Sequence, residues 1–326
     1  MKSVCCVAAK SGGHIIPCLQ FAITHHPNIP ISFISTNTAL DQKIKLQFPI
    51  IYDHCALDLI NVPYKKWLQL PSFIFSFLKT IIICVKYLKK HRPTEVISTG
   101  GFIALPVCIA AKLLRIPITL FELNAVPGKA TQVVSRFSNT TFICFKEAEK
   151  YFKQTTVITP YPLRFKTIDK QYKQHEIVKN LGLDPNKKTI CILGGSQGSE
   201  FLNGLIKTLP SFKDYQIIHQ TGSADVTDCQ NFYASQHIQA DVFAFKENLI
   251  PYYQAADFII CRAGAGTLFE VLFFEKKSLI IPLETSITDH QLDNARAMEK
   301  AYPHLFYVIR QQEIIKNPTI FFKALP

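Results

Sequence analysis

Four tight clusters of glycine mark the positions where this sequence can do chemistry. Nine of its thirteen glycines fall into these clusters. A chain that uses glycine so sparingly places it where the backbone must turn sharply or approach another group closely. The clusters are Gly12/Gly13, Gly100/Gly101, Gly194/Gly195/Gly198 and Gly264/Gly266.

The third cluster has the strongest chemical signature. In TICILGGSQGSEFLNGL, an apolar run leads through glycines into a helix-length segment. This order presents backbone N–H groups near a helix N-terminus, where they bind anions without a metal. The hydroxyl of Ser196 adds a donor. The pattern favours a phosphate site, and the alternative is a tight turn that binds no ligand.

Two other clusters carry ionisable side chains. In FIICRAGAGTLFE, we expect a helix whose first turn holds Glu270, which either accepts hydrogen bonds from ribose hydroxyls or caps the positive end of the helix dipole. In SGGHIIP, His14 opens a helix, where a neutral imidazole suits a general base; the alternative is a structural histidine. The turn STGGF is a further donor-rich segment, suited to a second phosphate-bearing ligand.

Several familiar sites are excluded by the sequence. It contains no GxGxxG and no glycine turn followed by Lys-Ser/Thr as in a P-loop. The ten cysteines form no CxxC pair and no Cys/His zinc spacing, so we interpret them as small core residues in a reducing compartment.

The elements that position these turns follow from the apolar pattern. Short continuous apolar runs alternate with helix-length segments, which predicts an α/β fold with two doubly wound parallel-sheet domains facing a cleft. A polar, proline-containing stretch at 155–188 marks the boundary, so we expect domains at 1–160 and 161–305 and a tail at 306–326 that packs back on the first domain. The predicted strands are 3–8, 31–35, 95–98, 118–121, 140–144, 189–193, 216–219, 242–245, 258–261 and 278–281.

Composition and charge point to the partners. The chain has 326 residues, 48% hydrophobic and 18% charged, with a net charge of +12. Between Asp58 and Glu95 it has no acidic residue but seven Lys/Arg, and a helix at 71–90 would have a wide apolar face. This pattern is typical of a segment, here 64–92, that rests on an anionic membrane surface; the alternative is a crossover helix packed on the sheet. No nucleic-acid partner is expected.

The whole chain resembles the MurG family of membrane-associated, inverting glycosyltransferases, which convert lipid I to lipid II. The resemblance implies a GT-B fold, UDP-N-acetylglucosamine as donor and undecaprenyl-pyrophosphoryl-MurNAc-pentapeptide as acceptor. It implies a peripheral protein on the cytoplasmic face of the cell membrane. It implies no required cofactor, and whether a divalent ion assists stays open. The matching segments, between residues 11 and 295, are SGGHIIP, STGGF, FELNAVPG, TPYPLR, GGSQGSEFLN, HQTG, CRAGAGTLFE and DHQLDNA.

The resemblance also implies roles for individual residues. His14 would deprotonate the sugar 4-hydroxyl of the acceptor. The SGGH turn, together with Gly100, Gly101 and Phe102, would bind the acceptor diphosphate. The residues implied to contact the donor are Ser11, Gly12, Gly13, Asn124, Arg164, Ser196, Lys246, Ala265, Gly266, Thr267, Leu268, Phe269, Glu270 and Gln291.

The sequence departs from the family at two motifs. Relatives have GGTGGH where this chain has AAKSGGH, and HEQN where it has FELN, so Phe121 and Leu123 replace polar residues. Two alternatives therefore stay open. Beside the predicted transfer to lipid I, these are another UDP-sugar enzyme of this fold, such as an epimerase or a transferase to a different acceptor, and a non-catalytic nucleotide-sugar binding protein.

Overall fold

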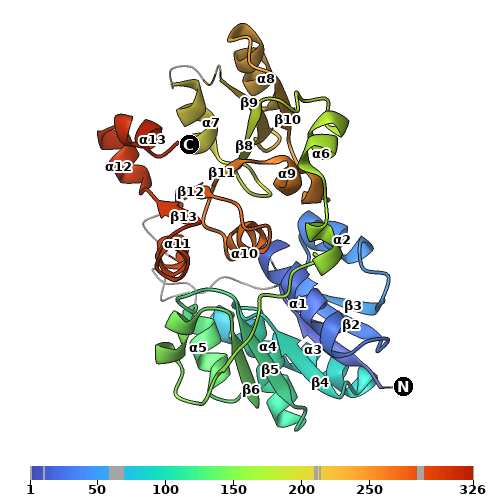
Figure 1. The fold of residues 1–326 in the computed structure, drawn as a ribbon. Helices are drawn as coiled ribbons and strands as arrows, with labels where there is room; N and C mark the ends of the chain where they lie inside the picture. Colours follow the sequence, from blue (N-terminus) through green and yellow to red (C-terminus); the bar gives the residue numbers. More distant parts are fainter. Residues whose placement is uncertain are drawn as a thin grey trace. The chain divides into compact units, whose positions relative to one another are not determined.

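The computed structural model describes residues 2–9, 12–58, 70–208, 212, 214–284 and 290–325. It divides into two compact units, Met1–Pro162 and Leu163–Pro326. Each unit is a parallel sheet with helices in its crossovers, so the predicted architecture of two doubly wound α/β domains is confirmed (Figure 1).

The N-terminal unit contains a seven-stranded parallel sheet with the order β3-β2-β1-β4-β5-β6-β7. Helices α3, α4 and α5 pack side by side, and α1 packs against α2. The elements are β1 (Val4–Val7), α1 (Gly12–His25), β2 (Ile31–Thr36), α2 (Ala39–Leu46), β3 (Ile51–Leu57), α3 (Leu70–His91), β4 (Glu95–Ser98), α4 (Ala104–Leu113), β5 (Ile118–Glu122), α5 (Lys129–Ser135), β6 (Thr140–Ile143), a 3-10 helix (Lys146–Tyr151) and β7 (Val157–Ile158).

The C-terminal unit contains a six-stranded parallel sheet with the order β10-β9-β8-β11-β12-β13. The elements are a 3-10 helix (Thr167–Lys170), α6 (Gln174–Asn180), β8 (Lys188–Leu193), α7 (Glu200–Lys207), β9 (Tyr215–Gln220), α8 (Val226–Ser235), β10 (Ala240–Phe243), α9 (Ile250–Ala255), β11 (Phe258–Cys261), α10 (Ala265–Phe273), β12 (Ser278–Ile280), α11 (His290–Ala301), β13 (Phe306–Val308), α12 (Gln311–Lys316) and α13 (Thr319–Lys323).

The order of strands reverses at one point in each sheet. The reversal falls between β1 and β4 in the N-terminal unit and between β8 and β11 in the C-terminal unit. The four glycine clusters follow the carboxyl ends of these same four strands. Because the carboxyl ends of parallel strands at a switch point are where such sheets bind ligands, each unit has its glycine turns at its expected binding position.

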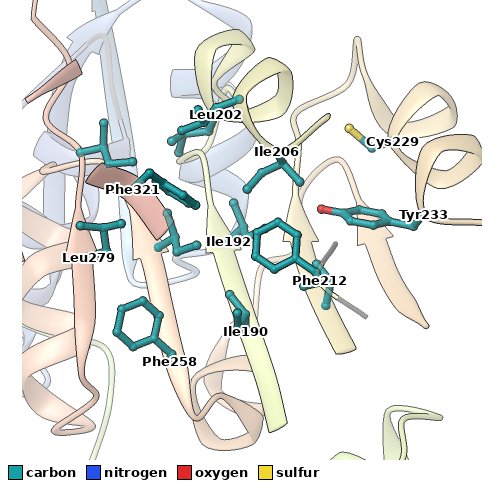
Figure 2. Close-up of a cluster of buried hydrophobic side chains, with 14 of the residues drawn as sticks. Ile190, Ile192, Leu202, Ile206, Phe212, Cys229, Tyr233, Phe258, Leu279 and Phe321 are labelled. Carbon is teal, nitrogen blue, oxygen red and sulfur yellow. The ribbon is translucent and has the colours of Figure 1, made fainter. Parts of the chain in front are cut away.

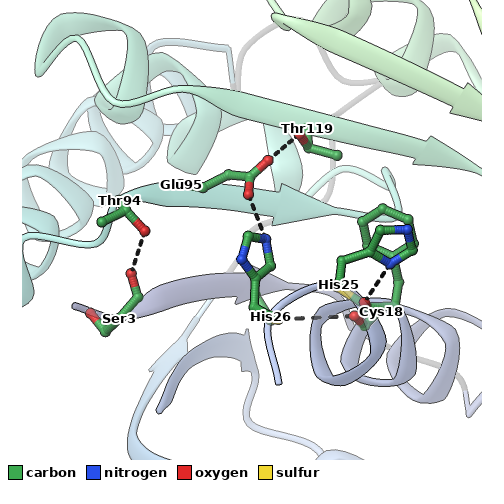
Figure 3. Close-up of polar contacts among 9 residues, drawn as sticks. Ser3, Cys18, His25, His26, Thr94, Glu95 and Thr119 are labelled. Atoms are coloured by element: carbon green, nitrogen blue, oxygen red, sulfur yellow. Dashed lines mark hydrogen bonds and ion pairs between the residues drawn. The ribbon is translucent and has the colours of Figure 1, made fainter. Parts of the chain in front are cut away.

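The end of α1 opposite to the glycine turn is anchored by polar contacts (Figure 3). His26, just after the helix, pairs with Glu95 at the start of β4, with 2.8 Å between Nε2 and Oε2. Thr119 at the start of β5 donates to the same carboxylate. These contacts fix the direction of α1 across the sheet and therefore the place of His14 in its first turn.

The core of the C-terminal unit includes the end of the chain. β13 pairs with β12, and Ile314 and Phe321 of the last two helices belong to the buried cluster of this unit. Figure 2 shows Phe321 in this cluster with Leu279 and Ile192. The described part of the tail at 306–326 is thus integral to the second sheet. Its expected contact with the first domain stays a prediction.

All ten predicted strands are confirmed, with ends that differ by no more than two residues. The sequence did not predict β3, β7 and β13, which are two-to-seven-residue strands at or near sheet edges. All ten cysteines are free and eight of them are buried, as expected for core residues.

Candidate functional site

His14 lies at the N-terminal switch point and is fixed by Thr99. Its Nδ1 is 3.2 Å from the carbonyl oxygen of Thr99, and the Thr99 hydroxyl donates to the His14 carbonyl oxygen at 3.0 Å. A carbonyl oxygen only accepts, so Nδ1 carries the proton and Nε2 carries the lone pair. In the neutral imidazole, this contact makes Nε2 the basic nitrogen of His14.

The two glycines of the STGGF turn have different surroundings. Both have positive φ, +80° for Gly100 and +78° for Gly101. A Cβ on Gly100 would lie 2.2 Å from the Thr131 hydroxyl of α5, whereas a Cβ on Gly101 would meet nothing within 4 Å. Gly100 is therefore required for packing, and Gly101 presents backbone to open space. Phe102 contacts α3 through Phe73 and Phe77, each with ring centroids 6.1 Å away.

Asn124 is held by a buried carboxylate that precedes it. The backbone N–H and side-chain amide of Asn124 both donate to Glu122 Oε1, at 2.8 Å and 3.1 Å. Glu122, the last residue of β5, is only 2% exposed. Burial raises its pKa to about 7, although the Asn124 hydrogen bonds lower it in part. The carboxylate fixes the direction of the Asn124 side chain.

The GGSQG turn of the C-terminal unit combines a packed side and an open side. A Cβ on Gly198 would lie 2.0 Å from the Thr221 carbonyl oxygen, and one on Gly194 would lie 2.7 Å from the Ser199 nitrogen. Gly195 has φ +89° and nothing within 4 Å, and Ser196 is exposed. The tight turn itself therefore requires glycine at positions 194 and 198. The open Gly195 and Ser196 are where a phosphate can approach the backbone.

Glu270 lies in the second turn of α10, not in the first turn as the sequence suggested, because the helix begins at Ala265. No side chain caps this helix, so the capping role expected as the alternative for Glu270 is wrong. Its Oε2 instead accepts from the Tyr253 hydroxyl at 2.6 Å. Burial raises the pKa of Glu270, while the Tyr253 bond and the Arg164 charge lower it.

Three further predicted residues, Gln291, Arg164 and Lys246, belong to the C-terminal unit. The Gln291 side-chain oxygen accepts from the backbone N–H groups of Ala263 and Leu283, at 3.1 Å and 2.9 Å, which leaves its NH2 group as the donor. Arg164 is exposed and donates to the Glu247 carbonyl oxygen at 3.3 Å. Lys246 is exposed, with its Nζ 5.5 Å from the Phe243 ring.

Helix α3 has both a packed face and an exposed apolar face. Thr80, Cys84 and Leu88 are buried, so the crossover interpretation is correct for one side of the helix. The adjacent side exposes Ile74, Leu78 and Ile82 at i, i+4 spacing. Phe75 is 73% exposed, and the surface includes Leu70 and Ile83. By length and composition, α3 is the one helix among the described residues able to cross a membrane. The remainder of the predicted segment 64–92, up to residue 69, lies outside the described residues.

Sequence families match both units. The N-terminal domain of glycosyltransferase family 28 matches residues 7–143, and the C-terminal domain of that family matches residues 189–317. The UDP-N-acetylglucosamine--N-acetylmuramyl-(pentapeptide) pyrophosphoryl-undecaprenol N-acetylglucosamine transferase of Thermosipho africanus is 32% identical over 96% of this chain and 88% of its own length. The chain belongs to the MurG family.

The fold of this chain is similar to that of solved structures. The crystal structure of MurG from Acinetobacter baumannii is 26% identical, with a TM-score of 0.75 over 100% of this chain and 91% of that chain. The UDP-GlcNAc 2-epimerase of Neisseria meningitidis bound to UDP-GlcNAc has a TM-score of 0.64 at 15% identity, over 99% of this chain and 92% of its own. The second likeness reflects a shared fold alone. The GT-B architecture expected from the sequence is confirmed.

Phe121 and Leu123, the two residues of FELN that differ from the family motif HEQN, lie in the core. Phe121 is fully buried against Phe21 and Phe142, with ring centroids 4.9 Å and 6.1 Å away, and Leu123 is 1% exposed. They change packing beside the site, while the Glu122–Asn124 pair of the motif is intact. Among the donor residues implied by the family, Ser11 lies outside the described residues.

Sequence reasoning missed three residues that fix the predicted ones: Thr99, Glu122 and Tyr253. Glu122 had a usable signal, since an acidic residue inside the apolar run ITLFEL must be buried with a polar partner. Thr99 and Tyr253 had none, because their contacts join segments that are 85 and 17 residues apart. The described residues include no cluster of three or more His, Cys, Asp or Glu able to hold a metal ion.

Proposed function

We propose that this chain transfers N-acetylglucosamine from UDP-N-acetylglucosamine to the 4-hydroxyl of MurNAc in lipid I, which gives lipid II with inversion at the transferred sugar. One observation carries the proposal. A relative named for this reaction aligns with 96% of the chain, and the shared motifs lie at the switch points of both sheets.

The C-terminal unit would bind the donor. The open backbone at Gly195 and the hydroxyl of Ser196 suit the diphosphate. Glu270 suits the ribose hydroxyls, because its carboxylate is held in place and can accept from a ligand. Arg164 would offset the negative charge of UDP, and the NH2 group of Gln291 would donate to the sugar.

Other donor contacts follow by position in the family motif. The backbone at Lys246 would contact the uracil. The first turns of α10 would line the nucleotide, and the N-terminus of this nine-residue helix adds a favourable field for the phosphates. The α10 residues concerned are Ala265, Gly266, Thr267, Leu268 and Phe269.

The N-terminal unit would bind the acceptor and activate it. Gly101 and Phe102 of the STGGF turn, and Gly12 and Gly13 at the start of α1, present backbone N–H groups for the acceptor diphosphate. His14 Nε2 would take the proton of the 4-hydroxyl as its oxygen attacks the anomeric carbon. The bond from that carbon to the phosphate oxygen breaks with the electron pair leaving on UDP.

The exposed side of α3 would hold the protein on the membrane that carries its acceptor. Ile74, Phe75, Leu78 and Ile82 would enter the lipid interface, and lysines of the same helix would face anionic headgroups. Phe102 touches α3, so the turn assigned to the acceptor diphosphate adjoins this surface. This arrangement favours a peripheral location on the cytoplasmic face, where the nucleotide donor is available.

The direct test is incubation of the purified chain with radiolabelled UDP-N-acetylglucosamine and lipid I, followed by separation of the lipids. We expect label in a lipid with one more sugar, and its loss in His14→Ala. Label that remains in a nucleotide sugar of altered configuration would indicate an epimerase. Binding of UDP without transfer to any acceptor would indicate a non-catalytic relative.

A further inference from the structure

A buried tyrosine on one helix contacts the carboxylate that we assign to the ribose. Tyr253 lies on α9, before β11, and Glu270 lies on α10, after β11. The Tyr253 hydroxyl is 2.6 Å from Glu270 Oε2. The tyrosine is 1% exposed, so its hydroxyl has no competing contact with bulk water. A short hydrogen bond to a carboxylate in such surroundings is of the strong, charge-assisted kind.

Aromatic packing fixes the place of the hydroxyl. The Tyr253 ring stacks on Phe274 at the end of α10, with ring centroids 5.3 Å apart and planes 10° apart. Phe165 packs on it edge-on, 6.0 Å away. A ring held on two sides cannot turn its hydroxyl away from Glu270. The donor is therefore already in position before any ligand binds.

The electrostatics of the pair also favour a protonated phenol that donates to an ionised carboxylate. Burial and the neighbouring Glu270 carboxylate raise the pKa of Tyr253, so the phenol stays protonated and donates. In return, the phenol favours the ionised form of Glu270 and opposes the effect of burial on its pKa. Because Oε2 accepts from Tyr253, the other oxygen, Oε1, is the one left to accept from a ligand hydroxyl.

We propose that Tyr253 is a positioning residue for the donor. It holds Glu270 so that Oε1 accepts the 2′-hydroxyl of the ribose, and it thereby sets the preference for a ribose over a 2′-deoxyribose nucleotide. The inference rests on the proposed ribose role of Glu270. Without the phenol, the carboxylate loses a partner and its direction. A hydrogen bond to a charged group changes an equilibrium by roughly ten- to hundredfold.

The test compares UDP with 2′-deoxy-UDP in Tyr253→Phe, which keeps the ring. By calorimetry on the full chain, we expect the UDP affinity to fall about tenfold and the 2′-deoxy-UDP affinity to change little. In turnover, KM for the donor rises while kcat changes little, because the ribose contact is equal in the bound substrate and the transition state. Tyr252→Phe is the matched control, since the neighbouring tyrosine packs on Phe243, 4.8 Å between centroids, and should keep the wild-type preference.

A second readout separates positioning from general damage. Loss of the phenol moves the pKa of Glu270 further up, so in Tyr253→Phe the UDP affinity falls away at a higher pH than in the wild type. A purely structural defect would lower the affinity by the same factor at every pH. If Tyr253→Phe proves unstable, 3-fluorotyrosine at position 253 keeps a phenol of greater acidity, and the pH profile should then move to lower pH. An unmoved profile would overturn the inference.

Glu270→Gln distinguishes the two proposals. If this variant keeps the wild-type preference for UDP over 2′-deoxy-UDP, the ribose role of Glu270 is wrong. If Glu270→Gln loses the preference and a folded Tyr253→Phe retains it in full, the role of Glu270 stands and that of Tyr253 is wrong.

Discussion

Glu122 should make the stability of the N-terminal domain fall as the pH rises. Burial raises its pKa from 4.5 to about 7 in the folded state. Between these values the folded protein holds a proton that the unfolded chain has released, so raising the pH favours unfolding. Since each pKa unit is worth about 1.36 kcal/mol, this residue removes roughly 3 kcal/mol of stability between pH 4.5 and 7. The full stability is present at low pH and is lost as the pH passes the folded pKa.

Glu122→Gln tests this reasoning. The amide cannot ionise, yet its oxygen still accepts from the Asn124 N–H groups, which now donate to Oε1. We expect the variant to lose this pH dependence and, at pH 8, to be more stable than the wild type by up to about 3 kcal/mol. Because the chain has two domains, the free energy of unfolding should be read locally, from hydrogen exchange of the β5 and β6 amides at pH 5 and 8.

The control is Glu149→Gln, which makes the same chemical change at an exposed position of the same domain. It should leave the pH dependence as in the wild type. If Glu122→Gln keeps the wild-type slope, the folded protein does not hold the extra proton on Glu122, and our account of the Glu122–Asn124 pair fails.

Three further predictions follow from the sites. His14→Ala should lower turnover by about 10²–10⁴ and leave UDP affinity unchanged in calorimetry; full activity would reject His14 as the base. Gly198→Ala should lower the unfolding temperature by roughly 5–20 °C, because the new Cβ strains the backbone and overlaps the Thr221 carbonyl oxygen. Gly195→Ala should lower the free energy of unfolding by only about 1–2 kcal/mol and mainly weaken UDP binding. Equal losses of stability in the two variants would contradict the assignment of a packed glycine and an open glycine. Phe75→Ser with Leu78→Ser should weaken sedimentation with anionic vesicles at least tenfold, since each buried side chain contributes about 1.5–3 kcal/mol, without lowering the unfolding temperature; unchanged sedimentation would remove α3 from the membrane contact.

Most of the strands that the sequence predicted are buried on both faces; the exceptions are β6 and the edge strand β10. Runs such as ITLF and FIIC are continuous and β-branched or aromatic, because both sides of the strand meet helices. β3 escaped prediction because Asp53 and His54 interrupt its apolar pattern, and an edge strand tolerates such residues where a central strand does not. β13 has only three residues and is defined by its pairing with β12.

The glycine motifs predicted where the sites lie, but they did not show which glycine of a motif is packed and which has open space beside it. The sequence treats Gly195 and Gly198 alike. The structure separates them, because only the backbone of the β9–α8 turn, brought against Gly198 by the fold, decides which glycine has room beside it. The same applies to α3, whose wide apolar face is one feature in the sequence and two surfaces, core and exposed, in the structure.

The sequence by itself determined the architecture, the family and the turns where ligands bind, because apolar periodicity and glycine placement are local properties of the chain. Only the tertiary structure decided the state of the reactive groups. The tautomer of His14 depends on Thr99, the raised pKa of Glu122 on its burial, and the direction of Glu270 on Tyr253. Protonation and orientation are set by whichever groups the fold brings within a few ångströms, and those groups come from distant parts of the chain.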